Sequence, residues 1–146
     1  MSNLLRISEA TSLGLHTMVL LAANEGRRIS AREVAELLDV SEAHLSKVMQ
    51  RLGRHGLVTS IRGPKGGFLL ARPGSEITLM EVFEAIEGPL NTGQCLLGKP
   101  ICDPRNCILG SLLHDVNVQV QTYLAGTRLS DLTKAYKDID VDDLDA

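Results

Sequence analysis

Residues Ser41 to Arg72 read SEAHLSKVMQRLGRHGLVTSIRGPKGGFLLAR, and this segment contains the clearest signals of secondary structure in the chain. Its first part predicts an amphipathic helix that begins after the N-cap residue Ser41 and ends at Gly56. Its second part predicts a β-hairpin, with strands over 57–61 and 68–71 and a glycine-rich turn over 62–67. The buried face of the helix is expected to hold Leu45, Val48, Met49 and Leu52.

Two more helices are predicted upstream of this stretch. Apolar residues at helical spacing indicate a first helix over 9–24, and a capping box formed by Ser30 and Glu33 indicates a second over 31–38. Two short helices separated by a turn, the second one basic and facing outward, form the helix-turn-helix arrangement. The sequence therefore predicts a mainly α fold with a small β-hairpin wing, in which residues 1–88 form a winged helix-turn-helix head.

Polar and basic side chains lie on the outer face of the predicted second helix-turn-helix element and in the hairpin turn. Hydrogen-bond donors and positive charge suit base edges and phosphates, and a cation in the turn could enter a minor groove. Any exposed hairpin needs glycines, so the order of the elements carries more weight than the turn alone. The candidate DNA-binding residues are Ser41, Glu42, His44, Ser46, Lys47, Arg51, Arg62, Lys65 and Gly66.

The distribution of charge supports a polyanionic partner. The net charge is -3, but residues 1–73 hold ten Lys or Arg against six Asp or Glu, a net of +4. Residues 74–146 hold five against twelve, a net of -7. A basic front half directs one face toward double-stranded DNA. The apolar run near the N-terminus is broken by polar residues, which predicts a cytoplasmic protein with no membrane partner.

The second half of the chain is expected to contain a short helix, a loop and a long helix. The short helix begins after Thr78 and ends at Gly88. Residues 89–107 contain three prolines and two glycines, which predicts an irregular loop. Residues 108–126 are predicted to form a helix with a wide apolar face that mediates homodimerisation and so presents two heads to a palindromic operator. The alternative is that this helix packs only on its own chain. Residues 127–146 are expected to form a short turn or helix and a disordered acidic tail.

All three cysteines, Cys95, Cys102 and Cys107, lie in the loop. Thiolates are soft ligands, and their irregular spacing favours an iron–sulfur cluster of the 2Fe–2S or 4Fe–4S type. Zinc, a thiol redox switch and unrelated buried cysteines are the alternatives, and the paired C-x-x-C knuckles of structural zinc are absent. A fourth ligand could come from His16, His114, Glu9 or a second chain. His16 could equally be a hydrogen-bonded core histidine, and His114 a solvated one.

Two other classes of function remain to be weighed against a cluster-dependent regulator. One is a metal-independent module that binds another protein through its winged head. Salt-sensitive binding to duplex DNA would separate the two classes. The other is an enzyme with a cysteine nucleophile, but the sequence offers no convincing base and no pocket-forming sheet. The chain is therefore predicted not to be an enzyme.

The segments SIRGPKGGFLLAR (60–72) and ITLMEVFEAIEGP (77–89), followed by a cysteine loop and a long helix, closely resemble the IscR/NsrR/RirA family of bacterial winged-helix regulators. The resemblance runs from Ile7 to about Leu132. It implies a homodimer in which the long helices cross and a cluster lies between the cysteine loop of one subunit and the head of the other. It also implies that the three cysteines are ligands and that Arg62 reaches the minor groove. The residues that it places at the DNA-reading end of the recognition helix are Ser41, His44, Ser46 and Lys47.

The chain departs from that family at three positions. Gly110 stands where one branch has a ligating histidine, Ser12 where another has a ligating aspartate, and Ser46 where the first branch has a glutamate that sorts DNA sites. His16 aligns with a histidine ligand of the first helix in one branch. The resemblance implies a regulator, usually a repressor, whose DNA affinity depends on a cluster that senses iron, redox state or nitric oxide.

Overall fold

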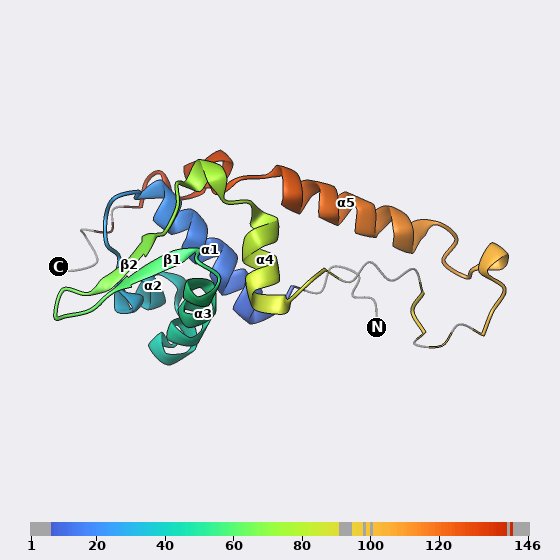
Figure 1. The fold of residues 1–146 in the computed structure, drawn as a ribbon, viewed down its shortest axis with the longest axis horizontal. Coiled ribbons are helices and arrows are strands. Elements are labelled where there is room, and N and C mark those ends of the chain that lie inside the picture. Colours follow the sequence, from blue (N-terminus) through green and yellow to red (C-terminus); the bar gives the residue numbers. More distant parts are fainter. Residues whose placement is uncertain (1–6, 91–94, 98, 100, 140, 142–146) are drawn as a thin grey trace.

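The computed structural model describes residues 7–90, 95–97, 99, 101–139 and 141. It is mostly helical, with one two-stranded antiparallel hairpin (Figure 1). In chain order, with α for α-helices and η for 3-10 helices, its elements are α1 Glu9–Ala23, α2 Ala31–Leu38, α3 Glu42–Arg54, β1 Val58–Ile61, β2 Gly67–Leu70, η1 Gly74–Glu76, α4 Leu79–Glu87, η2 Pro104–Asn106, α5 Leu112–Gly126 and η3 Leu129–Tyr136.

Helix α1 is the centre of the core and packs against α3, α4 and η3. Helices α1 to α4 each begin where the side chain of an N-cap residue accepts a hydrogen bond from a free N–H group. The predicted capping boxes at Ser30 and Thr78 are both formed, and the Ser41 hydroxyl accepts a hydrogen bond from the His44 N–H at 3.1 Å. The fully buried side chains include Met18, Leu20, Leu21, Ile29, Leu45, Met49, Leu52, Ile77 and Leu129.

The second strand of the hairpin forms backbone hydrogen bonds along both of its edges. Strand β2 pairs with β1, with Val58 opposite Leu70, and its other edge pairs with Ile29 through two hydrogen bonds to Phe68, of 2.8 and 3.2 Å. Gly67 allows this approach, because a Cβ atom there would lie 2.8 Å from the Ile29 carbonyl oxygen. The base of the wing is therefore held against the segment between α1 and α2, a contact that the sequence did not predict.

Helix α5 extends away from the head, and η2 lies beyond its far end (Figure 1). The helix begins at Leu112 rather than at 108, because the preceding residues form turns in which Gly110 has a φ of +58° and its N–H bonds to the Cys107 carbonyl. Among the described residues, every helix is too short or too polar to span a lipid bilayer.

The C-terminal segment returns to the core. The predicted short turn after α5 is the eight-residue helix η3, which packs against α1. Val141 is only 1% exposed, although the sequence predicted a disordered acidic tail. Residues 140 and 142–146, on which the rest of that prediction falls, lie outside the described residues.

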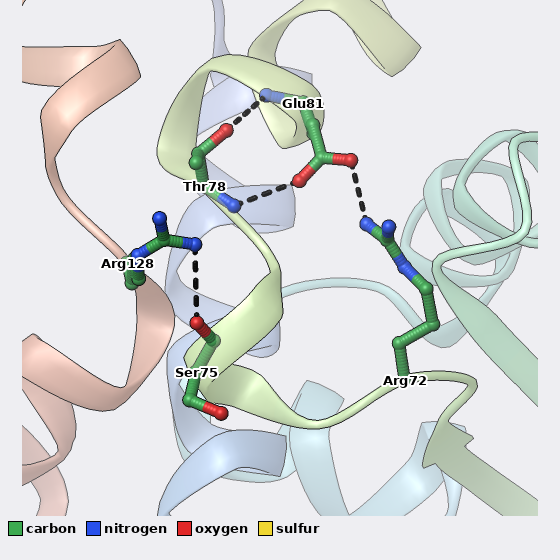
Figure 2. A network of polar contacts seen from close by, with 5 residues as sticks. All are labelled: Arg72, Ser75, Thr78, Glu81 and Arg128. Carbon is green, nitrogen blue, oxygen red and sulfur yellow. Dashed lines mark hydrogen bonds and ion pairs between the residues drawn. The ribbon is translucent and has the colours of Figure 1, made fainter.

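A polar network joins the wing, α4 and the end of α5 (Figure 2). The Arg72 guanidinium, just after β2, donates to the Glu81 carboxylate, which also accepts from the Thr78 N–H at 2.9 Å. Arg128, after α5, donates to the Ser75 carbonyl at 3.1 Å. Backbone hydrogen bonds of 3.0 Å also link Thr127 to Leu79 and Leu129 to Ile77. The end of α5 and the base of the wing therefore meet at the start of α4.

Glu81 makes the stability of this junction dependent on pH. Partial burial alone would raise the pKa of Glu81, but the hydrogen bond from the Thr78 N–H and the contact with Arg72 outweigh it and hold the pKa below 4.5. Because the folded pKa is depressed, the contribution is present above the unfolded value and is lost as the pH falls through the folded value.

Glu81→Gln is therefore expected to lower the free energy of unfolding at pH 7 by about 1 kcal/mol or less, as is usual for partly exposed ion pairs. The difference from wild type should shrink below pH 4.5, in urea titrations at a series of pH values. Glu84→Gln is the control, because it removes the same charge from an exposed site on the same helix. A difference that stays constant down to pH 3 would contradict the assignment.

Candidate nucleic-acid interface and cysteine loop

On the outer face of α3, some side chains make contacts within the chain and others are exposed to solvent. Ser41 is occupied as the N-cap, and the His44 ring lies 3.9 Å from the Glu9 carboxylate of α1. Glu42 and Lys47 are exposed, and Ser46 is half-buried. The outer face of the first two turns of α3 is therefore accessible to a ligand, whereas Ser41 and His44 at the start of the helix make contacts within the chain.

Arg51 is directed toward α4. Its guanidinium donates to the Ile86 carbonyl at 3.2 Å, in the last turn of α4. This contact satisfies one of the free carbonyl groups at a helix end and holds α3 against α4. The sequence pattern placed Arg51 with the DNA-facing residues, but a contact across 35 residues of chain cannot be derived from helical spacing.

The turn of the wing exposes two cations. Arg62 and Lys65 are exposed and make no hydrogen bond or ion pair within the described part of the chain. Gly66 serves the turn itself, because its N–H bonds to the Gly63 carbonyl at 2.9 Å and a Cβ atom would lie 2.5 Å from the Ile61 carbonyl oxygen. The wing is a tight turn that carries positive charge on long side chains at its tip.

An open cleft of about 600 Å³ separates α3 from the hairpin. Its walls include Gln50 and Arg54 of α3 and Ser60 of β1. Helical spacing could place the first two on the outer face of α3, but it could not show that the hairpin stands opposite them.

The three cysteines lie in an exposed part of the chain. Cys102 is exposed, Cys95 and Cys107 are half-buried, and none of them forms a disulfide. Between the last two cysteines, Asp103 caps η2 by accepting from the Arg105 N–H at 3.0 Å and from the Asn106 amide at 2.9 Å. The hydrogen bond from the Arg105 N–H holds the pKa of Asp103 below its ordinary value.

Large apolar side chains surround the cysteines without being covered. Ile101 is 82% exposed and Ile108 is 87% exposed. Leu96 and Leu97 are also exposed, as is Leu112 at the start of α5. Large exposed apolar side chains are often covered by another molecule when they gather on one surface.

The candidate fourth ligands are separate from the cysteines. His16 is exposed on α1, and its Nδ1 lies 2.7 Å from the Ser12 carbonyl oxygen, which leaves Nε2 available. His114 is exposed on α5, and Glu9 lies beside His44. Within the described ranges, no group of three His, Cys, Asp or Glu side chains is placed to hold a metal ion. Figure 1 shows α1, which carries His16, in the head, and η2, which lies between Cys102 and Cys107 in the sequence, beyond the far end of α5.

The donor chemistry of the loop nevertheless fits an iron–sulfur cluster. Three thiols on one accessible segment provide soft ligands of the kind that such clusters bind. Gly110, where a related branch has a histidine ligand, is a turn glycine with a φ of +58°. A fourth donor must come from elsewhere in the chain or from a second molecule.

The chain is similar to known transcriptional regulators in both sequence and structure. Residues 7–135 match the model of the Rrf2 family, described as iron-dependent transcriptional regulators. The regulator IscR of Cereibacter sphaeroides is 35% identical over 118 residues, which cover 78% of this chain and 76% of that protein. CymR, the global cysteine regulator of B. subtilis, has a similar structure, with a TM-score of 0.76, 30% identity, and coverage of 90% of this chain and 98% of that one. The structure of T. potens IscR gives a TM-score of 0.69 at 26% identity, with coverage of 90% and 88%.

Proposed function

The chain belongs to the Rrf2 family of transcriptional regulators, and from that premise we propose that it is a homodimeric repressor whose affinity for a palindromic operator is controlled by an iron–sulfur cluster. It is a DNA-binding transcription regulator and not an enzyme. The observation that carries the DNA-binding part of the proposal is the outward face of α3 beside a wing whose Arg62 and Lys65 have no partner in the described part of the chain.

In this proposal α3 reads the major groove and the wing tip enters the adjacent minor groove. Glu42, Ser46 and Lys47 lie at the accessible end of α3, and Arg62 and Lys65 supply charge to the minor groove. Ser41, His44, Arg51 and Gly66 have structural contacts of their own, and we assign them mainly to holding α3 and the wing in place.

Helix α5 supports the proposed dimer. Only three of its side chains are buried within one chain, namely Leu113, Asn117 and Leu124. Leu112 and Tyr123 remain 54% and 57% exposed. A second copy related by two-fold symmetry would cover this face and space two heads for the two halves of a palindrome.

Cys95, Cys102 and Cys107 would hold the cluster, of the 2Fe–2S or 4Fe–4S type. When bound, the cluster supplies iron that responds to oxidants, nitric oxide or iron shortage. Because α1 lies in the head and η2 lies beyond the far end of α5, a histidine ligand from α1 would be the partner subunit's His16. Helix α3 packs on α1, so a ligand on α1 would link the cysteine loop to the DNA-binding surface.

A thiol redox switch is the second candidate. It is favoured by the exposure of Cys102 and by the similarity to Staphylococcus aureus CymR, whose structure is known in an oxidized form, with a TM-score of 0.72 at 28% identity. Protein that binds DNA, carries no iron after anaerobic reconstitution, and loses DNA on mild oxidation would support the switch. A zinc site would instead give colourless protein with bound zinc.

Arg62→Ala tests the DNA-binding surface. An operator is first selected from a random duplex library with wild-type protein under anaerobic conditions. The variant is expected to bind it about 10- to 100-fold more weakly, because one arginine contact to DNA contributes ~1–3 kcal/mol. Affinity is measured by fluorescence anisotropy across a range of salt concentrations.

Lys134→Ala is the control, because it removes an exposed cation from η3. Equal binding by Arg62→Ala and wild type would remove the wing from the mechanism. If the affinity of wild-type protein for duplex DNA does not change with salt concentration, the result would instead favour a module that binds another protein.

A further inference from the structure

We infer that the cleft between α3 and the hairpin holds one sugar–phosphate strand of duplex DNA, with Arg54, Gln50 and Ser60 as its phosphate contacts. The inference rests on the proposed function and adds a subsite to it. The cleft has a volume of about 600 Å³ and opens to solvent between the last two turns of α3 and the start of the wing.

The path of the strand follows from the shape of DNA. The major groove and the neighbouring minor groove are separated by one sugar–phosphate strand. A protein that places a helix in one groove and a hairpin tip in the other must straddle that strand. The space between α3 and the hairpin is therefore where the strand must run.

The walls of the cleft suit a phosphate. Arg54, in the last turn of α3, is exposed and makes no hydrogen bond or ion pair with any described residue. Gln50 lies one turn earlier, and Ser60 faces them from β1. No Asp or Glu is among the described residues that line the cleft. An arginine with neutral donors around it is the usual protein partner of a phosphodiester.

The floor of the cleft fixes its shape. Met49 and Val58 are 1% and 6% exposed and belong to the hydrophobic core, and Phe68 packs against that core. The Phe68 backbone is also bonded to Ile29, which holds the strand in position. The donors on the two walls are therefore held apart by packed side chains, so the site exists before DNA arrives.

Gly53 allows the cleft to be blocked without disturbing the fold. It lines the cleft, is exposed, and lies within α3. A Cβ atom there would meet its nearest neighbour, the Val58 carbonyl oxygen, at 3.8 Å, which is ordinary contact. Glycine is also a poor helix former, so alanine at this position should not destabilise α3, and for glutamate the gain in helix propensity offsets the cost of a carboxylate near the C-terminus of the helix.

Gly53→Glu is expected to weaken binding to the selected operator by about 100-fold, because a carboxylate would face the phosphates at close range. Gly53→Ala should stay within about threefold of wild type and serves as the matched control. Circular dichroism and thermal unfolding of both variants check that the fold is intact. Wild-type affinity in a folded Gly53→Glu protein would overturn the inference.

Arg54→Gln separates a phosphate contact from a base contact. It is expected to weaken binding to operator and unrelated duplexes alike, by about tenfold, and to reduce the slope of log K against log salt by about one. A loss confined to the operator, or an unchanged slope, would overturn the inference. If wild-type protein binds DNA and the Gly53→Glu and Arg54→Gln variants bind it with the same affinity as wild type, only the assignment of the cleft fails. If wild-type protein binds no DNA, the proposed function fails with it.

Discussion

Replacing Cys102 with alanine is expected to turn a brown, anaerobically purified protein colourless. The chain has three cysteines, all in one loop, and Cys102 is the exposed one. Losing one thiolate leaves two for a cluster that requires four ligands, and iron and sulfide should fall to background. The visible absorption spectrum and the iron and sulfide content per chain measure the change. The same samples then show whether operator affinity depends on the cluster.

Lys99→Ala is the matched control for Cys102→Ala, because it changes another exposed residue of the same loop. It should retain the colour, iron and sulfide of wild type. Wild-type protein that stays colourless after anaerobic reconstitution would argue against a cluster and favour zinc or thiol chemistry. Full iron and sulfide in Cys102→Ala would show that this cysteine is not a ligand.

The double substitution Leu112→Asp, Tyr123→Asp is expected to convert a dimer into a monomer. At ~100° of rotation per residue, Leu112, Val116 and Tyr123 lie within about 40° of one another on α5. Leu112 and Tyr123 are more than half exposed in the single chain, so the fold does not depend on them. Removing two apolar side chains from each protomer, at ~1.5 kcal/mol each, weakens association by about four orders of magnitude.

Sedimentation velocity or light scattering at micromolar concentration measures the change in mass. His114→Asp with Ala125→Asp is the control, because it adds the same number of acids to exposed positions on the opposite side of α5. The control should remain dimeric. A monomeric wild type would show that α5 does not mediate homodimerisation. A dimer that survives the Leu112 and Tyr123 changes would place the interface on another face.

Most of the head could be predicted from the sequence, because its elements depend on local signals. The helix-turn-helix, the capping boxes at Ser30 and Thr78 and the hairpin are all present, with helix bounds within about two residues. The start of α5 was predicted four residues too early, because the apolar spacing continues through a turn that Gly110 closes. Apolar periodicity does not show where a helix stops when the flanking turn is itself apolar.

The candidate site was predicted less completely. The exposure of Arg62 and Lys65 follows from their place in a turn, and the sequence placed them there. The sequence did not predict three other features: the hydrogen bond from Arg51 to the Ile86 carbonyl, the pairing of β2 with Ile29, and the burial of Val141. Each depends on a neighbour that is distant along the chain.

The order of the elements, the loop that holds the three cysteines and the charge at the wing tip follow from the sequence alone, because spacing, caps and turn residues act over a few positions. Which polar side chains remain available to a ligand depends instead on the tertiary structure. Arg51 is bonded to α4, whereas Arg54 has no partner among the described residues and faces the cleft beside the hairpin. The tertiary structure also places α1 in the head and η2, which lies between Cys102 and Cys107 in the sequence, beyond the far end of α5 (Figure 1). The partners of these arginines and the positions of these helices depend on packing between segments that are distant in the sequence, and no local sequence pattern specifies that packing.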